Sequence, residues 1–189
     1  MELLGIAGSL RADSYNAMLL RAAAEQLPEG VELTVFDGLR EIPPYDEDLE
    51  AADQPAVEAL KAAIAEADGV LIATPEYNGS IPGQLKNALD WVSRPFDDNP
   101  LRNKPAAVIS SSTGMFGAVW ASAELRKVLG LIGARVLDRD TPVGMAKTAF
   151  DADGRLAGAG ADGYVEALRA TAHDLVELIH EREQLRAAA

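Results

Sequence analysis

Three polar loops contain the residues of this sequence that are best suited to bind an anion. The first, residues 8–16, carries the side chains of Ser9, Arg11, Ser14 and Asn16 ahead of a helical pattern. Backbone N–H groups at a helix start favour a phosphate, and hydroxyl, amide and guanidinium groups add donors. The loop lacks the Gly-Lys-Ser/Thr of a Walker A motif and the Gly-x-Gly-x-x-Gly of a dinucleotide-binding loop. We interpret it as a phosphate-binding loop of another type, and a polar loop in which Ser14 only caps the helix is the alternative.

The two later loops have the composition expected of a cofactor pocket. Residues 74–83 contain two prolines and the turn sequence Asn78-Gly79, so their backbone amides are held in a rigid edge. Residues 110–117 are rich in hydroxyl groups and glycine and again lead into a helical pattern. Together the loops would offer a phosphate cradle, a rigid amide edge and a glycine-lined approach, which suits a flat mononucleotide cofactor.

The elements that must position these loops alternate between strand and helix along the chain. Short apolar or alternating runs predict strands, and apolar residues at helical spacing predict helices. The expected strands are 3–7, 31–36, 69–74, 106–110 and 135–137, and the expected helices are 17–27, 55–67, 83–92, 118–131 and 164–186. This alternation specifies a parallel sheet with right-handed crossovers and helices on both faces. We therefore expect an α/β fold, a flavodoxin-like three-layer sandwich with a five-stranded parallel sheet, as one domain over residues 1–189.

This fold would bring the three loops together, because they follow the first, third and fourth expected strands. In such sheets ligands bind beyond the carboxyl ends of the strands, near the point where the strand order reverses. The sequence therefore predicts one ligand site, built from all three loops at one edge of the sheet.

Composition excludes several other kinds of chemistry. The 189 residues include no cysteine, which removes disulfides, thiolate nucleophiles and cysteine-ligated metals. The formal net charge of −13 opposes nonspecific attraction to nucleic acid or to an anionic membrane surface. No stretch approaches the roughly 18 apolar residues of a membrane span, and the acidic second residue does not suit a signal peptide. We expect a cytoplasmic protein that binds neither nucleic acid nor membrane.

The three loops also resemble the motifs of a known family. The motifs are Gly-Ser-Leu-Arg-x-x-Ser-Tyr-Asn at 8–16, Thr-Pro-Glu-Tyr-Asn-x-Ser-x-Pro-Gly-x-Leu-Lys-Asn-Ala-x-Asp-Trp at 74–91, and Ser-Ser-x-Gly-x-x-Gly at 111–117. In order and spacing the chain resembles the NADPH-dependent FMN reductase family, close to the bacterial chromate and quinone reductases. The resemblance implies bound FMN, NADPH or NADH as electron donor, and a homodimer or homotetramer. The acceptor would be a quinone, an azo compound, chromate or a flavin.

The same resemblance implies roles for individual residues. The FMN phosphate would be held by Ser9, Arg11, Ser14 and Asn16, with Arg11 as the only charged ligand. The ring and ribityl chain would lie against Pro75, Glu76, Tyr77, Asn78 and Gly79, and the pocket would be completed by Ser112, Thr113, Gly114 and Gly117. Donor and acceptor would react in turn at one face in a ping-pong reaction, and no catalytic side chain is expected. The chain departs from the pattern at Gly79, where many relatives carry an aromatic residue, and at Ala118, where they carry a second glycine.

Two other classes of protein share part of this pattern. An electron-transfer flavodoxin has the same fold and would use the charge of −13 to dock basic partners, but this chain has an arginine in its first loop and few loop aromatics. A serine hydrolase would need a Gly-x-Ser-x-Gly elbow, which the residues around Ser80 do not form. His173 and His180 are seven residues apart in the last expected helix, where a structural role is favoured over catalysis or metal binding. The flavodoxin-like electron carrier is therefore the main alternative.

Two apolar groups near the ligand edge suggest contact between subunits. Trp91 ends the third expected helix, and Trp120 begins the next one shortly after Phe116. We expect both tryptophans to contribute to a subunit contact, because large exposed apolar patches are unusual in monomers. The alternative is that each tryptophan packs beneath its own helix. Lys86 and Asp90, at i and i+4, are expected to form a surface ion pair.

Overall fold

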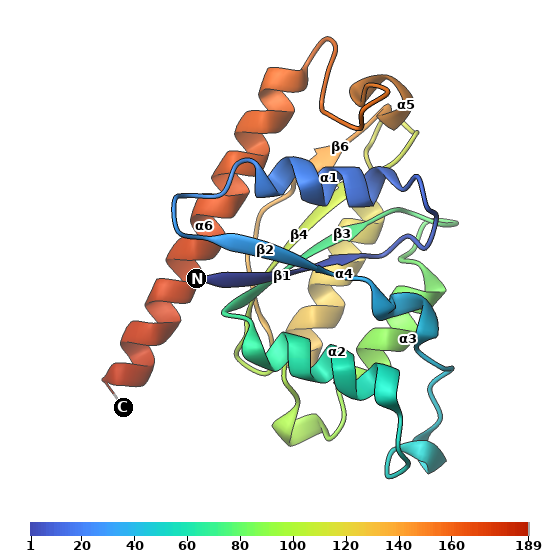
Figure 1. The fold of residues 1–189 in the computed structure, drawn as a ribbon, viewed down its shortest axis with the longest axis vertical. Coiled ribbons are helices and arrows are strands. Elements are labelled where there is room, and N and C mark those ends of the chain that lie inside the picture. Colours follow the sequence, from blue (N-terminus) through green and yellow to red (C-terminus); the bar gives the residue numbers. More distant parts are fainter. Residues whose placement is uncertain (189) are drawn as a thin grey trace.

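A computed structural model describes residues 1–188, in which a parallel sheet lies between two layers of helices (Figure 1). The strands are β1 (Glu2–Ala7), β2 (Glu32–Phe36), β3 (Gly69–Thr74), β4 (Pro105–Ser111), β5 (Arg135–Val136) and β6 (Pro142–Val143). The α-helices are α1 (Tyr15–Ala24), α2 (Pro55–Glu66), α3 (Gly83–Val92), α4 (Val119–Ile132), α5 (Ala146–Ala149) and α6 (Ala161–Ala187). Short 3₁₀ helices are η1 (Gly38–Glu41), η2 (Glu47–Leu49) and η3 (Phe96–Asp98).

The strand order is β2-β1-β3-β4-β5, with every pair parallel. The chain leaves β1 toward β2 on one side and then crosses to β3 on the other side. The order therefore reverses between β1 and β3, as in flavodoxin-like sheets. Strands β3 and β4 are buried along their whole length, as expected for central strands covered on both faces. The fold class expected from the sequence is confirmed.

The edge beside β4 differs from the single fifth strand that the sequence predicts. Strand β5 pairs with Pro105 and Ala106 at the beginning of β4, and β6 pairs with Ser110 and Ser111 at its end. The sheet therefore has six strands, two of which share one position. Residues 138–140 between them are Asp, Arg and Asp, which could not continue a strand covered on both faces without burying charge.

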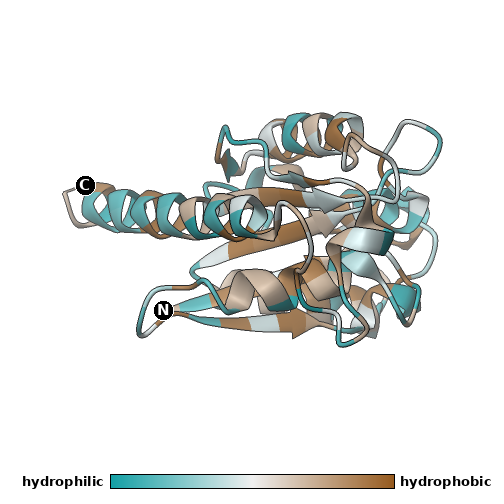
Figure 2. Cartoon of the chain, turned by 90° about the horizontal axis from the view of Figure 1, so that it is seen from above, coloured by the Kyte–Doolittle hydropathy of each residue, from teal (hydrophilic) through white to brown (hydrophobic). Residues whose placement is uncertain are grey.

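The two helical layers cover opposite faces of the sheet. Helices α1 and α6 pack on the face that includes Leu71 of β3, and α2, α3 and α4 pack on the face that includes Val70 and Ile72. Successive strand residues alternate between the faces, so each strand contributes to both cores. Figure 2 shows mostly apolar strands between the helices and a hydrophilic end of α6 that extends past the sheet. No helix within residues 1–188 is both long and apolar enough to cross a membrane.

The acidic segment after β2 covers helix α3 and thereby buries Trp91. The Trp91 side chain is 2% exposed, and its indole N–H donates to the carbonyl of Pro43 at 2.9 Å. The Asn87 side chain donates to the same carbonyl and accepts from the N–H of Tyr45. The expectation that Trp91 contributes to a subunit contact was wrong, because η1 and the chain after it already cover its helix. The predicted ion pair between Lys86 and Asp90 is confirmed, with 2.6 Å between Nζ and Oδ1.

Candidate functional site

A cavity of about 310 Å³ lies at the carboxyl edge of the sheet, where the strand order reverses. It is lined by Ser9, Arg11, Ser14, Tyr15, Asn16, Pro75, Glu76, Tyr77, Ser111, Ser112, Thr113 and Lys147. The loops after β1, β3 and β4 supply most of these residues; the exceptions are Tyr15 and Asn16 of α1, Ser111 at the end of β4, and Lys147 of α5. The three polar loops therefore meet at one site.

The side chain of Ser14 caps helix α1 at the floor of this cavity. Its Oγ accepts hydrogen bonds from the N–H groups of Asn16 at 3.2 Å and Ala17 at 3.4 Å. The predicted N-cap is thus confirmed. Within residues 1–188 the hydroxyl proton of Ser14 has no acceptor, so it can be donated to a ligand. The cap and the anion-binding loop are compatible, because they use different parts of one hydroxyl group.

The Asn16 side chain joins α1 to the end of β4. Its Nδ2 donates to the carbonyl of Ser111 at 3.0 Å, and its Oδ1 accepts the N–H of Ser111 at 3.1 Å. Both residues are buried, and they are 95 positions apart in the sequence. These two bonds satisfy the buried main chain of Ser111 and hold the loop after β4 beside the first loop. Asn16 therefore positions the wall of the cavity.

Two cationic side chains line the cavity. The Arg11 guanidinium donates to the carbonyl of Asp13 and lies 5.1 Å from the ring centroid of Tyr15. Lys147 comes from α5, which follows β6 and has no counterpart among the expected elements. Sequence reasoning missed it because a four-residue helix has no periodicity to detect. The site therefore has two positive charges where the sequence predicted one.

Among residues 1–188, Glu76 is the only acidic residue that lines the cavity, and its side chain is bound to helix α4. Its Oε2 accepts the N–H of Ala121 at 3.2 Å, near the start of α4. The N-cap position of that helix is Ala118, which has no capping side chain and a φ of 67°. Glu76 thus takes the place of an N-cap, where the helix dipole favours a negative charge. The positive φ of Ala118 is a conformation that favours glycine, so alanine is strained at this position.

The turn after β3 is rigid, as its sequence predicts. The N–H and carbonyl of Tyr77 bond with the carbonyl and N–H of Ser80, at 2.9 and 3.2 Å. Asn78 and Gly79 between them have φ values of 55° and 79°, which fits the type I′ turn preferred by Asn-Gly. Their own N–H groups have no partner within residues 1–188 and are exposed. The hydroxyl of Tyr77 is 3.4 Å from that of Ser9, so this turn also contacts the first loop.

The loop after β4 lies against β6 and α5. The N–H of Ser112 donates to Val143 at 3.2 Å, and the N–H of Met145 donates to Gly114 at 2.9 Å. Gly144 allows this contact, because a Cβ there would lie 2.2 Å from the carbonyl oxygen of Met115. Gly117 also lies close to this segment, since a Cβ there would lie 2.8 Å from the N of Val143. These glycines permit two backbones to touch beside the cavity.

The structure separates the predicted site residues into two groups. Those that line the cavity are Ser9, Arg11, Ser14, Asn16, Pro75, Glu76, Tyr77, Ser112 and Thr113. Those that do not line it are Asn78, Gly79, Gly114 and Gly117. The first two form the exposed turn at the end of the β3 loop, and the last two shape the β4 loop. The lining residues that were not predicted are Tyr15, Ser111 and Lys147.

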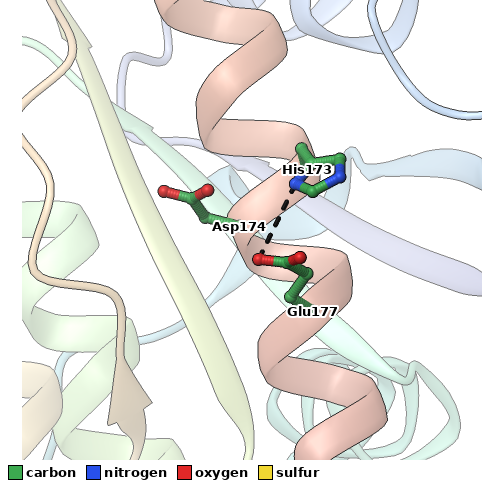
Figure 3. A group of neighbouring side chains, drawn as sticks. All are labelled: His173, Asp174 and Glu177. Carbon is green, nitrogen blue, oxygen red and sulfur yellow. Dashed lines mark ion pairs between the residues drawn. The ribbon is translucent and has the colours of Figure 1, made fainter.

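Both histidines lie on the exposed side of α6, away from the residues that line the cavity. His173, Asp174 and Glu177 have ligand atoms within 4.8 Å of one another, and His173 Nδ1 is 3.7 Å from Glu177 Oε2 (Figure 3). The Asp174 carboxylate already accepts hydrogen bonds from Nε and Nη2 of Arg139. Its charge is balanced by the Arg139 guanidinium, which ties α6 to the charged residues between β5 and β6.

Comparison with known proteins gives matches over most of the chain. Residues 1–148 match the family model described as NADPH-dependent FMN reductase. The chain is 43% identical over 158 residues to an NAD(P)H-dependent FMN reductase of Pseudomonas aeruginosa, covering 82% of this chain and 84% of that protein. It is 40% identical over 141 residues to a quinone reductase of Escherichia coli, covering 74% of each.

A solved structure is similar over almost the whole chain. It is a flavoenzyme NAD(P)H:(acceptor) oxidoreductase from Paracoccus denitrificans, with a TM-score of 0.82 and 33% sequence identity. The match covers 96% of this chain and 98% of that one. It therefore includes α6, which lies beyond the part matched by the family model.

Replacing Asn16 by alanine is expected to destabilise the fold. The substitution leaves the buried N–H and carbonyl of Ser111 without partners, and each unsatisfied group costs about 1–3 kcal/mol. We expect the free energy of unfolding, measured by urea denaturation, to fall by about 2–4 kcal/mol. Thr113→Ala is the control, because Thr113 lines the same cavity but is exposed, and its effect should stay within about 0.5 kcal/mol. Equal stability of the two variants would contradict the role given to Asn16.

Proposed function

Because the chain belongs to the NADPH-dependent FMN reductase family, we propose that it is an FMN-dependent oxidoreductase that takes electrons from NAD(P)H. Its acceptors are quinone-type compounds, in keeping with the names of its relatives. The proposal rests on one observation. The capped start of α1 and two cationic side chains line the same cavity, at the edge of the sheet where the strand order reverses between β1 and β3. When bound in such a site, FMN supplies the hydride and electron chemistry, and the protein supplies binding and orientation.

The charges around the cavity fit the phosphate of FMN. A phosphate monoester carries about −1.5 to −2 charges near neutral pH. Arg11 and Lys147 bring two positive charges, and the one acidic lining residue, Glu76, is directed to the start of α4. The unpartnered hydroxyl proton of Ser14 and the start of α1 add donors at the same place. We assign the phosphate to this end of the cavity, with Ser9, Arg11, Ser14 and Lys147 as its ligands.

The loop after β3 suits the flat ring of the cofactor. Its type I′ turn leaves the N–H groups of Asn78 and Gly79 exposed and without partners within residues 1–188. They would donate to the polar edge of the ring, where fixed donors stabilise a growing negative charge. Pro75 and Tyr77 would lie along the ring, and Ser112 and Thr113 would close the opposite wall. Gly114 and Gly117 act indirectly in this proposal, because they shape the loop that carries those two hydroxyl groups.

We also propose that the chain is one domain and acts in the cytoplasm. Helix α6 packs on the sheet through Ile179, which would lie 2.9 Å from a Cβ at Gly69. Helix α6 therefore belongs to the same hydrophobic core as the sheet whose carboxyl edge carries the cavity. NADH and NADPH, the donors proposed here, are available in the cytoplasm, which is in keeping with that location.

Replacing Arg11 by alanine should weaken FMN binding and spare the fold. A hydrogen bond to a charged group contributes about 1.5–3 kcal/mol, so the dissociation constant should rise about tenfold to a hundredfold. Lys147→Ala should weaken binding in the same direction, and the double variant should weaken it further. Equilibrium dialysis followed by flavin absorbance measures the constants. Arg21→Ala is the control, because Arg21 is an exposed residue of α1 that does not line the cavity. Unchanged affinity in the double variant would exclude this phosphate site.

Steady-state kinetics should show that donor and acceptor bind in turn. One cavity at the carboxyl edge has to admit both, so they exclude each other. We expect parallel double-reciprocal lines when NADPH or NADH is varied at several fixed quinone concentrations. Intersecting lines would show a ternary complex and contradict a shared site. An electron carrier of the flavodoxin type would bind FMN but would not turn over NAD(P)H and quinone by itself, so the assay also tests that alternative.

The loop after β4 carries apolar side chains that suit a contact between subunits. Phe116 and Trp120 are each 57% exposed and lie edge to face with ring centroids 5.3 Å apart. Met115 and Met145 beside them are 71% and 52% exposed. We call these four residues the apolar patch. We propose that this patch joins two copies of the chain, as a homodimer or within a homotetramer. Exposed aromatic and methionine side chains of this kind are enriched at protein interfaces.

Light scattering at micromolar protein should give at least twice the chain mass of 20.0 kDa. Trp120→Glu should give single chains, because it would bury a carboxylate in the contact. The matched control is Leu185→Glu, since Leu185 is 62% exposed but lies near the end of α6. A parent protein of single-chain mass with full reductase activity would exclude the proposed assembly.

A further inference from the structure

Helix α6 passes the amino ends of the central strands, at the edge of the sheet opposite the cavity. A Cβ at Gly69, the first residue of β3, would lie 2.9 Å from Cδ1 of Ile179 and 3.3 Å from the carbonyl oxygen of Pro105. Ile179 therefore lies over the beginning of both β3 and β4. Arg182 and Arg186 follow it at i+3 and i+7, on the same helix face.

The end of α6 extends beyond the strands on the side where the N-terminus lies (Figures 1 and 2). A helix of 27 residues is about 40 Å long, roughly twice the length of the central strands. The face that carries Arg182 and Arg186 therefore continues past the first residues of the strands. Asp68 and Lys104, which directly precede β3 and β4, lie at this edge.

Two cationic side chains are buried at this edge. Lys104 is 7% exposed and Arg182 is 5% exposed. Lys104 donates from Nζ to the carbonyls of Ala65, at 3.1 Å, and Ala67, at the end of α2. Arg182 makes no hydrogen bond or ion pair within residues 1–188, and its Nε is fully buried without a partner. Buried polar atoms are normally hydrogen-bonded, so an orphaned guanidinium nitrogen needs an explanation.

The acidic groups nearby balance these cations only in part. Burial and the charge of Arg186 lower the pKa of Arg182, and the charges of Asp68 and Glu183 offset part of that effect. Asp68 accepts the N–H of Glu2 at 2.8 Å and forms no ion pair within 4.0 Å in residues 1–188. Glu181 forms an ion pair with Arg135, with 3.6 Å between Oε2 and Nη2. Glu183, the residue after Arg182 in α6, is exposed. Burial, followed by the charges of Arg182 and Arg186, lowers the pKa of Lys104 to about 8. A net positive site is thus present in a protein whose formal net charge is −13.

We propose that Lys104, Arg182 and Arg186 form a second anion site, which binds a tetrahedral oxyanion as free phosphate or as the phosphoryl group of a small metabolite. An oxyanion would accept from the terminal N–H groups of the Arg182 guanidinium, which make no hydrogen bond within residues 1–188, and from the third proton of Lys104, which the two carbonyls leave free. Arginine presents several N–H groups in a fork that matches phosphate geometry. The site is about 20 Å from the cavity, the length of a central strand. It would connect the ends of α2 and α6 to the start of the sheet.

The test titrates inorganic phosphate into the FMN-saturated protein by isothermal titration calorimetry. Saturation with FMN keeps the carboxyl-edge cavity from binding the added phosphate. Sodium chloride at equal ionic strength separates a specific site from general screening. We expect saturable binding of phosphate and none of chloride. Glucose 6-phosphate, in a separate titration, distinguishes a site for a phosphoryl group, which binds it, from a site for the free ion, which does not.

Variants of the two arginines test the assignment. Arg182→Met keeps the length of the buried side chain and should weaken phosphate binding at least about tenfold, the effect of losing one charged hydrogen bond. Arg186→Gln changes an exposed residue near the helix end, so it tests the site even if Arg182→Met does not fold. It should weaken binding about threefold or more. Arg169→Gln is the control on the same helix, where the exposed side chain pairs with Glu166. Unchanged binding in Arg186→Gln and in any folded Arg182→Met would overturn the proposal.

A second readout follows the lysine itself. Nearby negative charge favours the protonated form, so phosphate should raise the pKa of Lys104 from about 8 toward its ordinary value. Nuclear magnetic resonance of protein with isotope-labelled lysine, titrated with and without phosphate, measures this shift. Lys147→Arg, in a parallel sample, removes the resonance of the one lysine in the cavity and leaves that of Lys104. A titration midpoint of Lys104 that phosphate does not move would overturn the proposal.

Discussion

The pair of hydrogen bonds between the Asn16 amide and the main chain of Ser111 determines the shape of the site. It joins the start of α1 to the end of β4, 95 residues later, and both residues are buried in the wall of the cavity. Because a buried amide and a buried peptide group must both be satisfied, this contact fixes their relative position closely. Glu76 plays a similar part, since its bond to Ala121 holds the β3 loop against α4. The walls of the cavity are therefore held by contacts with distant helices as well as by their own strands.

Charge in this protein has opposite effects at long and short range. A formal net charge of −13 repels an anionic ligand at a distance, and salt weakens that repulsion beyond about 10 Å. Within the cavity Arg11 and Lys147 are the nearer charges, so we propose that they outweigh the net charge for an anion bound there. The same contrast between net charge and local charge exists at the edge of the sheet where the central strands begin, since the cationic side chains Lys104 and Arg182 are buried there in an acidic protein. Local cations at both ends of the sheet thus coexist with a strongly acidic surface.

The division of the fifth strand position has a direct consequence for the site. Residues 138–140 leave the sheet because they are charged, and Arg139 pairs with Asp174 of α6. Strand β6 can then pair with the end of β4, which brings Gly144 against the loop that carries Ser112 and Thr113. Helix α5 begins directly after this contact and delivers Lys147 to the cavity. A short interruption at the sheet edge therefore supplies both a support for one loop and a second cation.

The sequence by itself determined the order of the main strands and helices, the edge of the sheet at which the cavity lies, and most of the residues that line this cavity. Periodicity and turn residues are local signals, so the limits of β3 and α3 were predicted to the residue. Tertiary structure alone decided the burial of Trp91, the hydrogen bonds between Asn16 and Ser111, the position of Lys147 at the cavity and the burial of Arg182. Each of these depends on a partner far away in the chain, such as Pro43 for Trp91. These contacts are decided by side-chain packing and by the need to satisfy buried polar groups. Neither requirement produces a periodic pattern that can be detected in the sequence.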